Sequence, residues 1–196
     1  LEYSLVEISE LNNLKEKKIV IAKELIKSVT ESCGLKKFTI IKSFKGSELN
    51  KTVCSHPFLK LGYDYDVPMF DARFVTLEQG TGIVHCAPSH GVDDFNLCLK
   101  NNIESKYTVD DSGYYTKEIP HFEKTHVFKA DPIVIDNLRE QKKLLKNDTL
   151  QHSYPHSWRS KAPLIYRATP QWFISMEVNS LRNKALKAIN ETNFYP

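Results

Sequence analysis

The segment that most constrains this chain is residues 80–95, GTGIVHCAPSHGVDDF. Two glycines open the segment, and a short apolar run then leads to His85. Two imidazoles and two carboxylates lie within ten residues of each other. A helix is predicted over residues 92–100, which places Asp93 and Asp94 in its first turn, where the helix dipole favours anions. The pattern predicts a tight turn that presents polar side chains at the start of a helix.

Short apolar runs separated by polar turns recur along the rest of the chain. Strands are expected at residues 1–8, 18–21, 38–45, 52–54, 70–77 and 83–86. Helices are expected at residues 22–33, 92–100, 131–145 and 178–189, with Gly34 ending the first and Asp131 capping the third. Residues 107–119 are expected to be hairpin-like and residues 151–173 extended. Many short strands with a few helices predict a mainly β fold, a small closed or partly closed β-barrel with peripheral α-helices.

Length and composition limit the classes of protein to which this chain can belong. A chain of 196 residues suits one domain with a short appendage, and a formal charge of +3 permits contact with a phosphate backbone without arguing for it. The four cysteines form no CxxC pair, so reduced thiols are expected rather than a zinc knuckle. The sequence contains no run of 18 apolar residues, so no membrane span is expected. Since the chain opens in a strand without an initiator Met, it is interpreted as a piece of a larger protein.

Residues 80–95, together with the tail HSYPHSWRSKAPLIYRATPQWFISM at residues 152–176, resemble the editing domain (connective peptide 1) of class I isoleucyl-tRNA synthetases. The resemblance implies a β-barrel domain over residues 1–150, followed by an extended return segment and helix over residues 151–196. It implies hydrolysis of valine wrongly attached to isoleucine tRNA, or of valyl-adenylate, by a cytoplasmic monomer. Hydrolysis would need no cofactor, because ATP belongs to a separate synthetic site of the parent enzyme.

The resemblance also assigns roles to individual residues. Asp94 matches the carboxylate that holds the α-ammonium group of the substrate, and His85 matches the imidazole that lines the side-chain pocket and excludes isoleucine. These two are the expected catalytic residues, and Ala87, His90 and Gly91 complete the expected substrate-binding set. From residue types alone, a carboxylate at a helix N-terminus is commonly structural. A lone His after an apolar strand is usually a residue of the core or its rim whose ring nitrogens have hydrogen-bond partners.

Other chemistries fit the same residues less well. A serine triad through Ser89 and His90 lacks the GxSxG nucleophile elbow. A metal site built from His85, Cys86, His90 and Cys98 lacks a recognised ligand spacing, so no metal is expected. The favoured mechanism uses water as the nucleophile, with the ribose hydroxyl or phosphate of the substrate as the base.

Two alternatives remain open. Editing domains for valine and leucine usually contain AHDxxDF where this chain has SHGVDDF, which favours the isoleucine type. In the isoleucyl family a threonine-rich strand lies upstream of the segment that matches residue 1, so a passive tRNA-docking module without catalysis is the second hypothesis.

The aromatic side chains of the tail are typical of a packing cluster, although they could stack on nucleotides: Tyr154, Trp158, Tyr166, Trp172 and Phe173.

Overall fold

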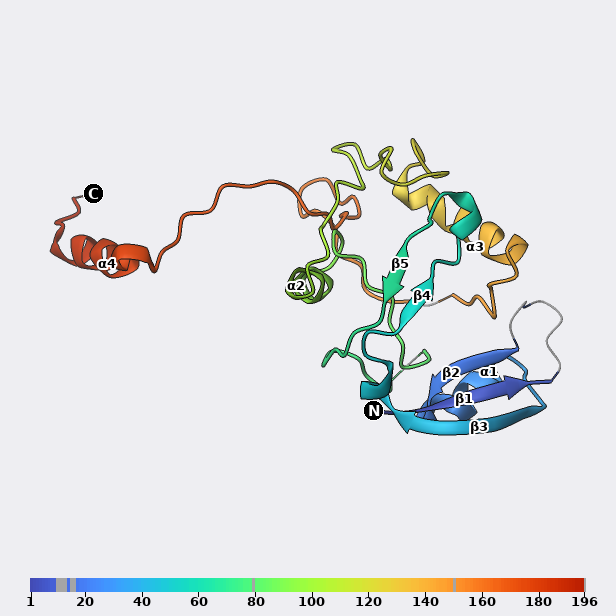
Figure 1. Ribbon diagram of the computed structural model, residues 1–196. Coiled ribbons are helices and arrows are strands. Elements are labelled where there is room, and N and C mark those ends of the chain that lie inside the picture. Colours follow the sequence, from blue (N-terminus) through green and yellow to red (C-terminus); the bar gives the residue numbers. More distant parts are fainter. Residues whose placement is uncertain (10–13, 15–16, 79, 150, 196) are drawn as a thin grey trace.

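The computed structural model describes residues 1–9, 14, 17–78, 80–149 and 151–195 (Figure 1). The strands are β1 Glu2–Ile8, β2 Lys18–Ala22, β3 Phe38–Lys45, β4 Val53–Ser55 and β5 Asp66–Pro68. The α-helices are α1 Ile26–Ser32, α2 Val92–Lys100, α3 Ala130–Glu140 and α4 Leu181–Glu191. The short 3₁₀ helices are η1 Lys23–Leu25, η2 Gly46–Leu49, η3 Leu59–Leu61, η4 Val127–Lys129 and η5 Val178–Ser180.

The first half of the chain builds a three-stranded antiparallel sheet in the order β2-β1-β3. Val6 of β1 and Ile21 of β2 are fully buried and pack with Ile26 and Val29 of α1. Burying an aliphatic side chain of this size contributes about 1.5–3 kcal/mol, so this cluster is the main apolar core. Gly34 ends the helical segment with a φ of +67°, as the sequence predicts.

A second, smaller core is built on the segment that joins β4 to β5. Cys54 of β4 pairs with Val67 of β5 in an antiparallel ladder of three residue pairs. Phe58, Tyr63 and Phe122 are buried together beside this ladder, and side chains of α3 pack against them. Strands of only three residues hold few ladder hydrogen bonds, so this aromatic cluster supplies much of the packing that fixes the loops around β4 and β5.

The tail of the chain is extended and leaves the two cores (Figure 1). Residues 151–177 contain no helix or strand, η5 leads directly into α4, and every residue of α4 is exposed. The tail aromatics do not form the packing cluster that the sequence suggests, because Trp158 is 78%, Trp172 102% and Phe173 86% exposed. None of the helices in the described part of the chain has the length and apolarity needed to cross a bilayer.

The expected mixture of short strands and peripheral helices is confirmed, but the closed barrel is not found. The described strands form two open sheets of three and two strands, and 29% of the described residues are helical against 17% in strands or isolated bridges. The edge strand β3 stays exposed along nearly its whole length, including Phe38 and Ile40. The described strands therefore lack the pairing between first and last strands that closure requires.

Two predicted strands were wrong, and the helix expected at residues 131–145 has other bounds. Residues 70–77 contain turns instead of a strand, because the pairing with the β4 region ends where Met69 exchanges hydrogen bonds with Lys51 and Thr52. Residues 83–86 pair with no strand and are not buried, with Val84 51% exposed. Helix α3 begins at Ala130 and ends at Glu140, so Asp131 lies inside its first turn instead of capping it.

Candidate active site

The glycine turn before His85 is fixed to the first sheet. The Tyr3 hydroxyl donates to the carbonyl oxygen of Gly82 at 2.6 Å, and the backbone N–H of Ala22 donates to the Thr81 carbonyl at 2.8 Å. Gly82 has a φ of +76°, and a Cβ there would lie 2.5 Å from Cβ of Ala22. Only glycine therefore allows this close approach of the turn to β2.

Asp94 folds back over the turn that precedes α2. Its Oδ2 accepts a hydrogen bond from the backbone N–H of Ala87 at 2.9 Å. The N–H of His90 donates to the Ala87 carbonyl at 2.9 Å, which closes the turn, and Gly91 is the N-cap of α2. A Cβ on Gly91 would lie 3.2 Å from Oδ2 of Asp94, so glycine leaves room for the carboxylate. Asp94 is half-buried while Asp93 is exposed, as expected for adjacent helical positions.

His90 stabilises the turn before α2 through hydrogen bonds at both of its ring nitrogens. A carbonyl oxygen can only accept, so Nδ1–H of His90 donates to the Tyr166 carbonyl at 2.7 Å. Its Nε2 lies 2.8 Å from Oγ1 of Thr108, whose hydroxyl can donate to the neutral ring. Both ring nitrogens are therefore engaged within the protein. A substrate-binding role for His90 stays a prediction, and any such role would act through the turn that His90 holds.

Ser89 also stabilises this turn through hydrogen bonds. Its buried hydroxyl donates to the Lys106 carbonyl at 2.6 Å and lies 3.0 Å from Oγ of Ser105. The Ser89 carbonyl accepts from the N–H of Ala168 at 2.7 Å. These bonds give Ser89 a structural task and direct its hydroxyl away from the nucleophile role that the missing elbow motif already disfavours. Sequence reasoning missed the contact with residues 166–168, because it joins segments nearly 80 positions apart.

His85 is exposed, and it lies within electrostatic range of a residue that the sequence did not single out, His56. Burial lowers the pKa of His56, and the proximity of His85 lowers it further, since two cationic rings would repel. The His56 ring is stacked on Tyr63 with centroids 4.6 Å apart and planes 13° apart. Neither the HPF sequence around His56 nor its spacing from His85 indicates this pairing.

The thiols near Asp94 have raised pKa values. Burial raises the pKa of Cys86, and the negative charges of Asp94 and of a Cys98 thiolate raise it further. Burial and Asp94 likewise raise the pKa of Cys98. Thiols with raised pKa values are poor nucleophiles and poor metal ligands at neutral pH. No group of three or more potential metal-binding side chains occurs in the part of the chain that the structure describes.

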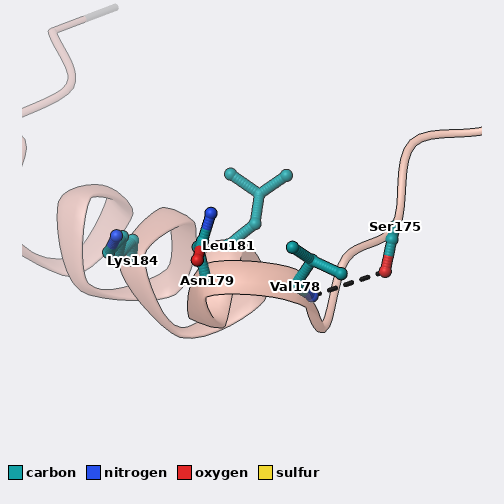
Figure 2. Close-up of a pocket in the computed structure, with 5 residues that line it drawn as sticks. All are labelled: Ser175, Val178, Asn179, Leu181 and Lys184. Atoms are coloured by element: carbon teal, nitrogen blue, oxygen red, sulfur yellow. Dashed lines mark hydrogen bonds between the residues drawn. The ribbon is translucent and has the colours of Figure 1, made fainter.

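Two surface hollows lie away from these residues. One of about 360 Å³ is formed at the start of α4 by Ser175, Val178, Asn179, Leu181 and Lys184 (Figure 2). Another, of about 680 Å³, lies between α1 and β3 over Ile26, Leu35, Phe38 and Ile40. Neither includes His85 or Asp94. Both are open to solvent, so we base the candidate site on the hydrogen-bonded turn at residues 85–94.

Comparison with known proteins gives a consistent result. Residues 5–148 match the protein family described as "Leucyl-tRNA synthetase, editing domain". The chain is 64% identical over 196 residues to an isoleucine–tRNA ligase of Pelagibacter ubique, covering 100% of this chain and 22% of that protein. It is 44% identical over 191 residues to that of Gluconobacter oxydans and 43% identical over 196 residues to that of Shewanella piezotolerans, covering 20% of each.

Because the family match covers most of its length, the chain belongs to the editing-domain family of the aminoacyl-tRNA synthetases. Within that family, the expected resemblance to isoleucine–tRNA ligases is confirmed by these relatives. The chain spans about a fifth of their length.

Proposed function

We propose that this chain hydrolyses the ester that joins valine to the 3′ end of isoleucine tRNA. The observation that carries the proposal is the editing-domain match over residues 5–148 combined with 64% identity along the whole chain to an isoleucine–tRNA ligase. The ligand would be the aminoacyl end of the tRNA, and small valine-containing molecules such as valyl-adenylate would bind in the same way. The enzyme would act in the cytoplasm, where tRNAs are charged, with the module as a monomer.

The energetic need for such a reaction is clear. Valine lacks one methylene of isoleucine, and a binding pocket discriminates such a pair by only ~1–3 kcal/mol, a limit for which isoleucine ligases are themselves the usual example. A second site that accepts valine and excludes isoleucine by size can remove the remaining errors.

The proposed mechanism assigns Asp94 to the substrate's ammonium group. Oδ2 of Asp94 is held by the Ala87 N–H, and Oδ1 has no hydrogen-bond partner among the described residues. The free oxygen can bind the ammonium and orient the ester for attack by water, so binding energy is converted into positioning. The exposed His85 ring would limit the size of the amino-acid side chain. Water is the nucleophile, and a ribose hydroxyl or phosphate of the substrate is the base.

The module boundary and the barrel are part of the same proposal. The family match ends at residue 148, which supports an editing domain over residues 1–150 and a return segment over residues 151–196. The exposed apolar side chains of β3 support completion of the barrel by further strands of a longer polypeptide, including the threonine-rich strand.

A passive tRNA-docking module is the competing proposal. It is favoured by the exposed aromatic side chains of the tail and by Arg159, whose guanidinium lies 4.9 Å above the Trp158 ring. Such rings can stack on unpaired bases. The docking module would bind tRNA without cleaving the ester.

A deacylation assay separates the two proposals. Valyl-tRNA(Ile) is incubated with the complete polypeptide that carries this chain, and release of valine is compared for the wild type, Asp94→Ala and Asp93→Ala. Editing predicts that the wild type and Asp93→Ala release valine and that Asp94→Ala does not, while isoleucine charging survives in all three. Absence of release by the wild type would favour docking, and loss in Asp93→Ala alone would show that the wrong carboxylate was chosen.

A further inference from the structure

The protonation pattern of His56 is fixed by its backbone environment. Its Nδ1 receives a hydrogen bond from the backbone N–H of Phe58 at 3.0 Å. An amide N–H can only donate, so Nδ1 must be unprotonated, and the neutral ring carries its proton on Nε2. His56 is therefore the Nε2–H tautomer.

The orientation of the ring is also fixed. It stacks on Tyr63, whose hydroxyl donates to the Pro120 carbonyl at 2.8 Å and whose ring is buried in the second core. Tyr65 lies 5.5 Å from His56 between ring centroids and is 56% exposed, so it borders the open side of the cluster. A ring held by a hydrogen bond at one nitrogen and by a stacked aromatic face has little rotational freedom left.

The remaining nitrogen is a donor without a partner. Among the described residues, no group bonds to Nε2 of His56, although the residue is only partly exposed. His85 lies close enough for electrostatic interaction. Burial and His85 both disfavour a charge on His56, so the ring stays neutral at physiological pH. The structure thus presents a fixed, neutral N–H within electrostatic range of His85, the imidazole already assigned to the site.

We propose that His56 is a catalytic residue of the editing reaction, whose Nε2–H donates a hydrogen bond to the carbonyl oxygen of the aminoacyl ester. This inference rests on the proposed function. A neutral imidazole suits the task, because a donor that keeps its proton polarises a carbonyl without protonating it.

The step balances without any further reactant. The oxygen of water forms a bond to the ester carbon, and the carbonyl π electrons move to oxygen, where the His56 N–H stabilises the developing charge. Collapse of this intermediate breaks the bond to the ribose oxygen, which takes up the proton lost by the attacking water. The products are valine and tRNA with a free hydroxyl, and His56 ends in its original state.

Two substitutions separate catalysis from structure. In His56→Asn the side-chain oxygen can still accept the Phe58 N–H, as asparagine before proline commonly does, but the Nε2 donor is lost. In His56→Gln the longer amide can place an N–H near the former Nε2, while the bond to Phe58 is lost. Loss of one oxyanion donor lowers kcat about 100-fold or more. We therefore expect His56→Asn to deacylate valyl-tRNA(Ile) about 100-fold more slowly, and His56→Gln to retain more activity than His56→Asn.

A matched control exists in the same chain. Nδ1 of His126 accepts from the N–H of Phe128 at 3.3 Å, which is the same local hydrogen bond at another histidine. His126→Asn should deacylate as the wild type does. If His56 is only structural, the order reverses: His56→Asn is near wild type and His56→Gln is impaired, which would overturn the inference.

The remaining outcomes are equally decisive. If Asp94→Ala loses hydrolysis while a folded His56→Asn keeps it, the proposed function stands and the inference fails. If the wild type does not hydrolyse the ester, both fail. Should His56→Asn not fold, ¹⁵N NMR of the wild-type imidazoles is the test, with a non-hydrolysable amide analogue of valyl-adenosine as the probe. The Nε2 signal of His56 should shift on saturation, and an unmoved signal would overturn the inference.

Discussion

Asp94 and Ala87, seven positions apart, are joined by a hydrogen bond of 2.9 Å from the Ala87 N–H to Oδ2 of the carboxylate. The bond ties the start of α2 to the loop that carries His85. It uses one carboxylate oxygen and leaves the other without a hydrogen-bond partner among the described residues. One side chain can therefore hold the turn and bind a substrate cation at the same time.

Asp94→Asn should separate these two tasks. Its amide oxygen can keep the bond from Ala87, so we expect the free energy of unfolding to change little. The negative charge is lost, which costs about 1.5–3 kcal/mol of transition-state binding, or roughly 10- to 150-fold in kcat/KM. Deacylation kinetics and denaturant unfolding measure the two effects. Wild-type kinetics in Asp94→Asn with a defect in Asp94→Ala would mean that Asp94 serves the fold alone.

Gly91→Ala should disturb the carboxylate from the other side. The backbone of Gly91 is extended, with φ at −156°, so alanine is conformationally allowed. Its Cβ would lie 3.2 Å from Cγ and Oδ2 of Asp94 and must displace that side chain. A misfit of this kind costs about 1–3 kcal/mol, so we expect deacylation to fall about tenfold or more. Val92→Ala, at a position 75% exposed on the same helix end, is the control and should be neutral.

His85→Ala should relax the size filter. Isoleucine has one more methylene than valine, worth ~0.8 kcal/mol of burial, so the native site must reject it by steric overlap. Such overlap costs about 1–3 kcal/mol, and removing the imidazole removes it. The variant should begin to deacylate correctly charged isoleucyl-tRNA while retaining most hydrolysis of valyl-tRNA. The ratio of the two rates is the measurement, and an equal fall in both would assign His85 to catalysis or structure.

His56 should make stability depend on pH in a defined direction. Its pKa in the folded protein lies below the ordinary value of 6.5. The unfolded chain therefore takes up a proton first as the pH falls, and the stability contributed by neutral His56, complete above pH 6.5, is lost progressively below it. The groups facing the ring are His85, Tyr63 and Tyr65. The difference in unfolding free energy between wild type and His56→Asn should shrink from pH 8 to pH 5, and a constant difference would contradict this assignment.

Local sequence signals determined much of the secondary structure. The strand at Phe38–Lys45 and the helix at Val92–Lys100 were predicted at the bounds that the structure has, because apolar spacing and a glycine start are local properties. The carboxylate pair at the start of α2 was located in the same way. Residues 83–86 failed because an apolar run predicts a strand only if a partner strand pairs with it, and none of the described strands does.

The sequence by itself determined the elements around the candidate site, its family resemblance, and which residue types it offers. Only the tertiary structure decided how those residues are used. The engagement of both His90 nitrogens by Thr108 and Tyr166, and the position of His56 within electrostatic range of His85, join segments 18 to 76 positions apart. Contacts of that kind depend on which cores pack together, and burial free energy summed over many side chains selects that packing, whereas a local pattern carries no record of it.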